Sequence, residues 1–179
     1  MLKPDETVFV LIDVQGKLAQ VMHQKEDLFR NLQILVQGLQ ALDIPVLWLE
    51  QYPEGLGPTI PEIAELLPDD AAIPKVCFSG CGQPEFRARL QNLNRKQVLV
   101  AGIEAHICVY QTVGDLLDMG HEVEVVADAV SSRTPENRQV GLDRMSSMGA
   151  SITSVEMLLF ELLGEAGSDV FRQVAKLVK

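Results

Sequence analysis

The chain has 179 residues, of which 47% are hydrophobic and 22% are charged, and its formal net charge is −10 at pH 7. This length suits one domain with a sizeable core, and the composition is that of a folded chain rather than a disordered one. The negative charge would repel nucleic acids and anionic membranes, so we expect neither as a partner.

The three cysteines are Cys77, Cys81 and Cys108, an odd number that disfavours a disulfide scaffold. The spacing of Cys77 and Cys81 lacks a second pair of ligands, so we expect no zinc site there. The N-terminus is polar, its first apolar run contains Asp13, and no apolar run approaches the roughly 20 residues of a membrane span. We therefore expect a cytosolic protein.

Short apolar runs alternate with segments of helical periodicity along the chain. The runs predict strands at residues 7–14, 44–49, 71–78, 97–101, 122–127 and 149–152. Helical spacing predicts helices over residues 18–22, 28–42, 62–67, 84–93, 105–119, 134–148, 154–163 and 169–178. Residues 50–61 and 129–134 are expected to be loops. Pro74 interrupts the third strand and favours an edge position for it.

Alternating strands and helices predict a parallel sheet covered by helices on both faces, in a single domain over residues 1–179. Ligands of such folds bind beyond the carboxyl ends of the strands, at the point where the strand order reverses. Asp13 ends the first strand and Cys108 follows the fourth. These two side chains meet if their strands flank that point.

Cys108 is expected in the first turn of a helix, after a sharp turn at Gly102. The N–H groups and positive dipole end of a helix can lower a cysteine pKa below its usual value of about 8.5 and can hold an oxyanion. A cysteine in this position can also simply pack the helix, because free cysteine is among the most buried residues.

Asp13 and Lys75 both lie at the carboxyl ends of predicted strands. A carboxylate at the position of Asp13 needs a partner or a cleft, since burying it alone is costly, or it caps the helix at Gly16. A lysine such as Lys75 is most often solvated. Together with Cys108 they offer a base and a cation beside a thiol, which nucleophilic catalysis requires.

Four further residues are candidates for the wall of a substrate pocket: Gln51, Tyr52, Phe78 and His106. His106 lies two residues before Cys108 and can face either the cleft or the helix surface.

These residues stand in segments that resemble the isochorismatase-like cysteine hydrolases. The resemblance runs from Val8 to about Leu163 and consists of LIDVQ around Asp13, PKVCFS around Lys75, GIEAHICV around Cys108, and the later VADAVSSR. Each segment alone is a weak signal, but the set in this order and at these intervals is specific. The likeness is greatest to the small isochorismatase-domain proteins, and the stretch EQYPEGLGPT supports that branch.

The resemblance implies a three-layer αβα sandwich with a six-stranded parallel sheet, Rossmann-like in class and often assembled as homo-oligomers. It implies a catalytic triad in which Cys108 is the nucleophile, Asp13 the proton acceptor and Lys75 the supporting cation. The Ile103–Glu104 bond matches a position where the family holds a non-proline cis peptide. The backbone N–H groups of Glu104 and Cys108 would then form an oxyanion hole.

Two departures from the family pattern limit what is carried over. Nicotinamidases of this superfamily bind a metal through an Asp-x-His and a further histidine after the second strand. The corresponding WLEQYP has no histidine, so we expect no metal and no other cofactor. Isochorismatases proper cleave a vinyl ether and can lack the cysteine, whereas this chain retains Cys108.

The sequence therefore predicts a metal-independent cysteine hydrolase that acts on a C–N bond of a small amide through a thioester on Cys108. One alternative is a catalytically silent binding or assembly module on the same scaffold. Another is an ether hydrolase of the isochorismate type. A nucleotide-binding Rossmann domain is disfavoured because Asp13 is followed by Val-Gln-Gly and not by a glycine-rich turn.

Overall fold

The computed structural model describes residues 1–67 and 72–179, in which strands and helices alternate. The strands are β1 (Thr7–Ile12), β2 (Val46–Gln51), β3 (Ala72–Lys75), β4 (Gln97–Ile103), β5 (Glu122–Ser131) and β6 (Ser151–Thr153). The helices are α1 (Gly16–Gln20), α2 (Lys25–Ala41), α3 (Pro53–Leu56), α4 (Pro61–Ala64), α5 (Pro84–Leu93), α6 (Tyr110–Asp118), α7 (Pro135–Ser147), α8 (Val155–Leu163) and α9 (Asp169–Leu177).

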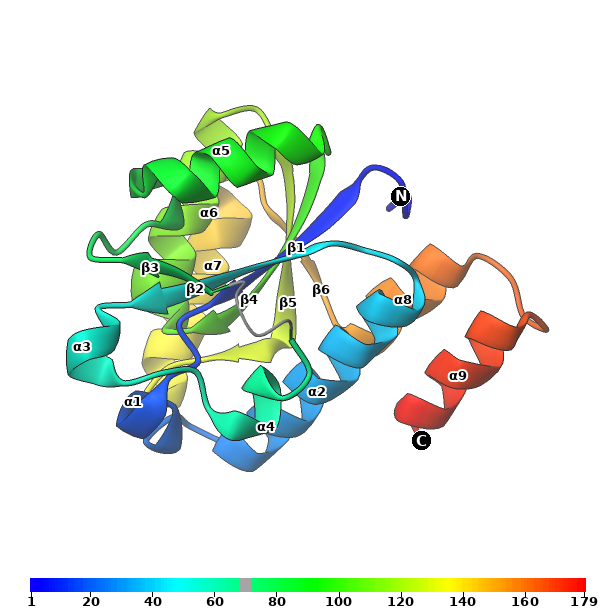
Figure 1. Ribbon diagram of the computed structural model, residues 1–179, viewed down its shortest axis with the longest axis horizontal. Helices are drawn as coiled ribbons and strands as arrows, with labels where there is room; N and C mark the ends of the chain where they lie inside the picture. Colours follow the sequence, from blue (N-terminus) through cyan, green and yellow to red (C-terminus); the bar gives the residue numbers. More distant parts are fainter. Residues whose placement is uncertain (68–71) are drawn as a thin grey trace.

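The six strands form one parallel sheet in the order β3-β2-β1-β4-β5-β6. Helices α5, α6 and α7 cover one face of the sheet, while α2 and α8 cover the other and α9 packs on α2 (Figure 1). The three-layer sandwich expected from the sequence is confirmed. β3, which contains Pro74, lies at an edge, where the missing N–H of a proline does least harm.

The middle of the sheet consists of strands whose residues are buried on both faces. Every residue of β1 and of β4 is buried, in keeping with their runs of valine, leucine and isoleucine. Each such side chain contributes roughly 1.5–3 kcal/mol when it is fully buried. The apolar runs therefore fix β1 and β4 at the centre, and any polar group at their ends is held by a rigid core.

The strand order reverses between β1 and β4, which are neighbours in the sheet. At their carboxyl ends Ile12 pairs with Gly102, and Gly102 has a φ of +118°. A Cβ at Gly102 would lie 2.1 Å from the carbonyl oxygen of Ile12. Glycine is therefore required for the close approach of these two strands, directly before Asp13 and Glu104 leave the sheet.

Several predicted boundaries differ from the structure. β5 continues through Ser131 into the predicted loop 129–134, because a register shift after Val100 lets its end pair with Gly102 and Ile103. The predicted loop 50–61 contains the end of β2 and the short helix α3. The predicted strand 71–78 is a strand only over Ala72–Lys75, and its first residue, Ala71, lies outside the described residues.

Candidate active site

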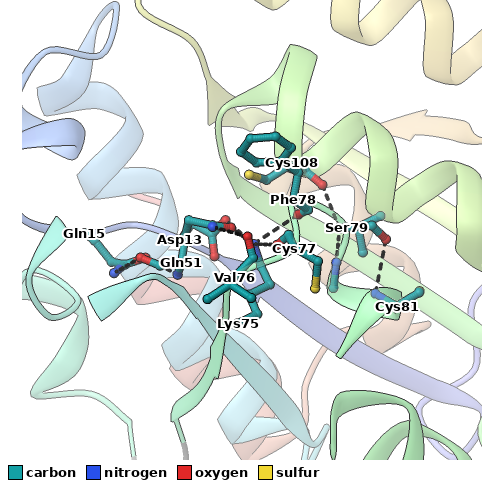
Figure 2. Close-up of polar contacts among 12 residues, drawn as sticks. Asp13, Gln15, Gln51, Lys75, Val76, Cys77, Phe78, Ser79, Cys81 and Cys108 are labelled. Atoms are coloured by element: carbon teal, nitrogen blue, oxygen red, sulfur yellow. Dashed lines mark hydrogen bonds and ion pairs between the residues drawn. The ribbon is translucent and has the colours of Figure 1, made fainter. Parts of the chain in front are cut away.

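Three polar side chains far apart in the sequence meet at the carboxyl end of the sheet. Asp13, Lys75 and Cys108 are 1%, 2% and 7% exposed. Asp13 Oδ2 accepts a hydrogen bond from Lys75 Nζ at 2.7 Å (Figure 2). Cys108 and Asp13 line the same cavity. They follow or end β1, β3 and β4, so the sheet topology brings them together.

Asp13 leaves β1 in a left-handed backbone conformation, with a φ of 55°. Its N–H donates to Leu49 O at 3.1 Å, and its carbonyl accepts from the Gln15 N–H at 2.8 Å. Aspartate tolerates this conformation better than most residues. The residue before α1 is Gln15, whose side chain makes no cap bond, and the Asp13 carboxylate pairs with Lys75 instead of capping the helix.

Lys75 is held by four acceptors. Besides Asp13, its Nζ contacts Gln51 Oε1 at 2.7 Å, Phe78 O at 3.0 Å and Cys77 O at 3.2 Å. Its side chain is 0% exposed, and Lys75 is not among the residues that line the cavity beside Cys108. The ammonium therefore orients the Asp13 carboxylate and the backbone that follows β3, from behind the cavity wall.

The second carboxylate oxygen, Asp13 Oδ1, is buried and forms no hydrogen bond with the described residues. Burial raises the pKa of Asp13, while the charge of Lys75 opposes that rise. The Cys108 thiol lies near enough to lower the pKa of this carboxyl as a weak donor. A carboxyl that Lys75 holds by one oxygen thus stands beside a thiol.

The Cys108 thiol departs from the sequence-based expectation in two ways. It lies in a π-helical turn, Ala105–Val109, that precedes α6 and is closed by a bond from the Val109 N–H to Glu104 O at 3.2 Å. The expectation of a lowered pKa is wrong, because burial, followed by the negative charge of Asp13, raises the pKa of Cys108 to about 12. Burial and the neighbouring carboxylate therefore favour the neutral thiol.

A cavity of about 120 Å³ opens onto the thiol. Its apolar wall consists of Leu18, Leu56, Phe78, Ile103 and Ile107. Its remaining wall consists of Asp13, Gln51, Glu104 and Cys108. This volume is small beside the roughly 300–1,000 Å³ of pockets that hold drug-sized ligands.

Of the four predicted wall residues, two line this cavity and two do not. Gln51 and Phe78 belong to the wall. Tyr52 is 53% exposed, and its ring packs so closely over Gly55 that a Cβ there would lie 2.3 Å from it. His106 turns away from the cavity, with its Nδ1 2.9 Å from Ser132 Oγ. Their side-chain directions depend on local turns that the sequence pattern does not specify.

Gln15 is a buried residue of this site that the sequence reasoning missed. Its Oε1 accepts from the Gln51 N–H at 2.6 Å, and its Nε2 donates to Gln51 O at 3.1 Å (Figure 2). The same Nε2 donates to Gly57 O at 2.7 Å. It thereby ties the end of β2 to the end of α3. The sequence feature that could have identified Gln15 is a second polar residue shortly after Asp13, in LIDVQ.

Glu104 contributes a side chain as well as a backbone group. The Ile103–Glu104 bond is cis. Glu104 Oε2 accepts from Arg133 Nε at 3.1 Å and from the Arg133 N–H at 3.2 Å, which ties the end of β4 to the residues after β5. Arg133 stands in the VADAVSSR segment, for which the sequence suggested no role.

Within residues 1–67 and 72–179, no three His, Cys, Asp or Glu side chains gather in a way that could hold a metal ion. The expected absence of a metal and of a zinc site at Cys77 and Cys81 stays a prediction.

The fold and the site place the chain in the isochorismatase-like class of α/β proteins. A family profile described as the Isochorismatase domain matches residues 7–157. The chain is 39% identical to the secreted isochorismatase effector Isc1 of Phytophthora sojae over 99% of this chain and 87% of that protein. It is 37% identical to human isochorismatase domain-containing protein 2, over 98% and 84% of the two chains. The chain belongs to the isochorismatase family.

Solved structures show the same fold. The MAR1 ribonuclease of Caenorhabditis elegans superposes with a TM-score of 0.92 at 35% identity, over 99% of this chain and 91% of that one. YcaC of Escherichia coli, described as an octameric hydrolase of unknown specificity, superposes with a TM-score of 0.89 over 99% of this chain and 86% of that one. YcaC is 22% identical to this chain, so its likeness shows the fold alone.

Proposed function

We propose that this protein is a cysteine hydrolase that cleaves the C–N bond of a small amide through a thioester on Cys108. The observation that carries the proposal is the Asp13 carboxylate. Its Oδ2 is bonded to Lys75, its Oδ1 is buried without a hydrogen bond to the described residues, and the Cys108 thiol lies near enough to this carboxyl to lower its pKa. Keeping such an acceptor out of water costs free energy, and groups held at such a cost are typical of functional sites. The cavity on the other side of the thiol offers room for a small substrate.

In the first half of the reaction the Cys108 sulfur attacks the amide carbonyl carbon while the thiol proton moves to Asp13 Oδ1. A neutral thiol needs this transfer during attack, since its raised pKa keeps it protonated at rest. Asp13 then gives the proton to the leaving nitrogen, the C–N bond breaks, and ammonia or an amine departs. An acyl thioester and an ionised Asp13 remain.

In the second half a water molecule attacks the thioester carbonyl, and Asp13 accepts one of its protons. The C–S bond breaks, the carboxylic acid departs, and the proton returns from Asp13 to the sulfur. The sum is one amide and one water converted into one acid and one amine. Lys75 stays bonded to Asp13 Oδ2 throughout, so it acts as a positioning residue that holds the carboxylate and offsets its charge.

The tetrahedral intermediate of each half carries an oxyanion. We assign its stabilisation to the backbone N–H groups of Glu104, which directly precedes the π-helical turn, and of Cys108, which lies within it. Both residues line the cavity, and the side chain of Glu104 is fixed by Arg133. The N–H of Glu104 belongs to the cis bond with Ile103.

Two alternatives remain. An ether hydrolase of the isochorismate type would act on a substrate that bears carboxylates, whereas Asp13 and Glu104 are the ionisable cavity residues besides Cys108 within the described chain. A silent binding or assembly module would leave Cys108 without turnover. Retention of a thiol beside a free carboxylate oxygen favours the amide hydrolase over both.

The decisive experiment compares Cys108→Ala with Cys81→Ala on a panel of small amides, ureides and carbamates, with release of ammonia or amine as the readout. We expect Cys108→Ala to lower turnover by at least about a thousandfold, because the nucleophile is gone. Cys81 is equally buried but does not line the cavity, so its variant should retain activity. Circular dichroism checks the fold of both, and unchanged turnover in Cys108→Ala would exclude covalent catalysis by this thiol.

We also propose that the protein is a cytosolic homo-oligomer that binds no nucleic acid. In the described residues no helix is long and apolar enough to cross a bilayer. With a net charge of −10 we expect no nucleic-acid binding, although the Caenorhabditis elegans relative is described as a ribonuclease. The cytosolic location and the homo-oligomer stay predictions. Light scattering after size exclusion tests the assembly.

A further inference from the structure

The cavity beside Cys108 limits which amides can react there. We propose that the substrate is an uncharged amide with a short apolar acyl group, and that Leu18, Leu56, Phe78 and Ile107 select it. This inference rests on the proposed amide hydrolysis and names its substrate class.

Besides Ile103 at the end of β4, the apolar wall is assembled from four separate segments. Leu18 comes from α1, Leu56 from α3, Phe78 from the segment after β3, and Ile107 from the π-helical turn. Phe78 is 55% exposed, so its ring stands at the mouth, and its carbonyl is fixed by Lys75 Nζ at 3.0 Å. Apolar side chains at the mouth and along the wall favour a substrate body that gains by leaving water.

The side-chain amide of Gln51 and one carboxylate oxygen of Glu104 are already hydrogen-bonded to other partners. Gln51 Oε1 accepts a hydrogen bond from Lys75 Nζ, and Gln51 Nε2 donates to Val76 O at 2.8 Å. Glu104 Oε2 is bonded to Arg133. Hydroxyl or charged groups on the acyl chain would therefore be buried with few partners, which costs free energy.

The ionisable groups of the wall also select against charge on the substrate. Among the described residues that line the cavity none is Lys, Arg or His, while Asp13 and Glu104 are acids. The nearest buried cation, Lys75, is taken by four acceptors. A substrate carboxylate would meet acids without a counter-ion, and a substrate ammonium would occupy Asp13 Oδ1, the oxygen that the reaction needs.

The volume of about 120 Å³ restricts the acyl chain to a few carbons. In an apolar pocket one added or missing methylene changes kcat/KM by about 10–200-fold. The preferred amide should therefore be sharply optimal in chain length, with both shorter and longer homologues slower.

Acrylamide and acrylate provide a matched test that does not depend on hydrolysis. Each adds to a thiol so that sulfur bonds the terminal alkene carbon and the thiol proton ends on the adjacent carbon. Labelling of Cys108 is measured by peptide mass spectrometry in the folded protein and in urea. The ratio of acrylamide to acrylate rates in urea gives the intrinsic preference of the same residue in the same charged chain.

We expect the ratio of acrylamide to acrylate labelling rates to be at least about tenfold larger in the folded protein than in urea. The reason is that bringing the unpaired carboxylate of acrylate into an apolar cavity costs free energy. Equal ratios would overturn the inference. Leu56→Arg adds a cation to the wall and should lower the folded ratio at least about tenfold. Val140→Arg adds the same charge at an exposed position of α7 and should leave it unchanged.

If Leu56→Arg fails to fold, Phe78→Arg carries the test, because its ring is already half exposed at the mouth. A folded ratio that neither arginine lowers would also overturn the inference. Selective acrylamide labelling without turnover of any amide would support the cavity argument and contradict the proposed hydrolysis. Turnover of charged and uncharged amides alike would contradict this inference alone.

Discussion

Cys81 and Cys108 are two buried thiols in very different surroundings. They are 6% and 7% exposed, and burial is the main cause that raises the pKa of each to about 12. Cys81 lies in the turn Gly80–Gly82, where the negative charge of Asp115 has the largest effect of any charged group on its pKa. Cys108 has a cavity on one side and the free oxygen of a lysine-bound carboxylate on the other.

Burial and pKa therefore do not separate these two cysteines. A search for a depressed thiol pKa would reject both, although only one stands where a proton acceptor and a substrate could meet. What distinguishes Cys108 is a neighbour, Asp13, whose carboxylate is kept half unbonded at a free-energy cost.

The largest effects are expected from Asp13→Asn. Loss of the proton acceptor should lower amide turnover by about 10²–10⁴-fold. The same change removes a negative charge that raises the pKa of Cys108, so more thiolate forms and alkylation by iodoacetamide at pH 8 should become faster. Turnover and alkylation, measured on one preparation, should move in opposite directions.

The matched variant is Asp115→Asn, which removes the charged neighbour of Cys81. It should speed the alkylation of Cys81 and leave amide turnover as it was, because Asp115 lies outside the cavity wall. If Asp13→Asn slowed alkylation and turnover together, the carboxylate would be holding the thiol in place and not accepting its proton.

Next in size is the effect of Lys75→Met on stability. The change leaves a buried carboxylate without its cation, which typically costs about 3–5 kcal/mol of unfolding free energy. Lys96→Met is the control, since Lys96 pairs with Glu122 at 2.6 Å with both side chains more than half exposed, and such pairs contribute about 0–1 kcal/mol. Urea denaturation measures both.

A double variant separates two explanations of that loss. Replacing both partners, in Asp13→Leu with Lys75→Met, removes the uncompensated charge and should recover most of the stability while abolishing turnover. A double variant as unstable as Lys75→Met would mean that packing of the lysine stem, and not the charge pair, supports this end of the sheet.

The contrast between Cys81 and Cys108 could be predicted in part from the sequence. Asp13 and Cys108 follow strands whose apolar runs mark them as buried on both faces. The βαβ topology predicts that these two side chains meet if their strands flank the point where the strand order reverses. The edge position of β3 followed from Pro74. The pKa of Cys108 was not predictable, because the helix-terminus argument ignored how deeply the thiol is buried and how near Asp13 lies.

The cavity wall was the least predictable part. Gln15 acts through the backbone of Gln51 and Gly57, distant in sequence, and no local pattern reveals hydrogen bonds of that kind. Tyr52 and Gln51 are adjacent, yet one ring packs outward over Gly55 while the other side chain lines the cavity. Side-chain direction in irregular segments is set by how several loops close on one another, which one chain's sequence does not state.

The smallest expected effect concerns the burial that the two thiols share. An unfolded thiol has a pKa of about 8.5, whereas both folded thiols have a pKa of about 12. At a pH below the pKa of the unfolded thiol, the folded and the unfolded chain both keep the thiol proton, and each thiol makes its full contribution to the unfolding free energy. As pH rises above it, the unfolded chain loses protons first, so each thiol's contribution to stability declines until the pH passes the folded pKa.

Between pH 8 and pH 10 this should cost the parent protein about 1 kcal/mol per thiol, after allowance for solvent screening. In urea titrations at the two pH values, the unfolding free energy of Cys81→Ala and of Cys108→Ala should each fall less than that of the parent, and by similar amounts. Equal reductions in the two variants would show that burial acts alike on both thiols, so that the chemistry of Cys108 comes from Asp13 and the cavity. If Cys81→Ala reduced the loss of stability relative to the parent but Cys108→Ala did not, the thiol of Cys108 would already be ionised near neutral pH. Proton transfer from Cys108 to Asp13 would then be unnecessary.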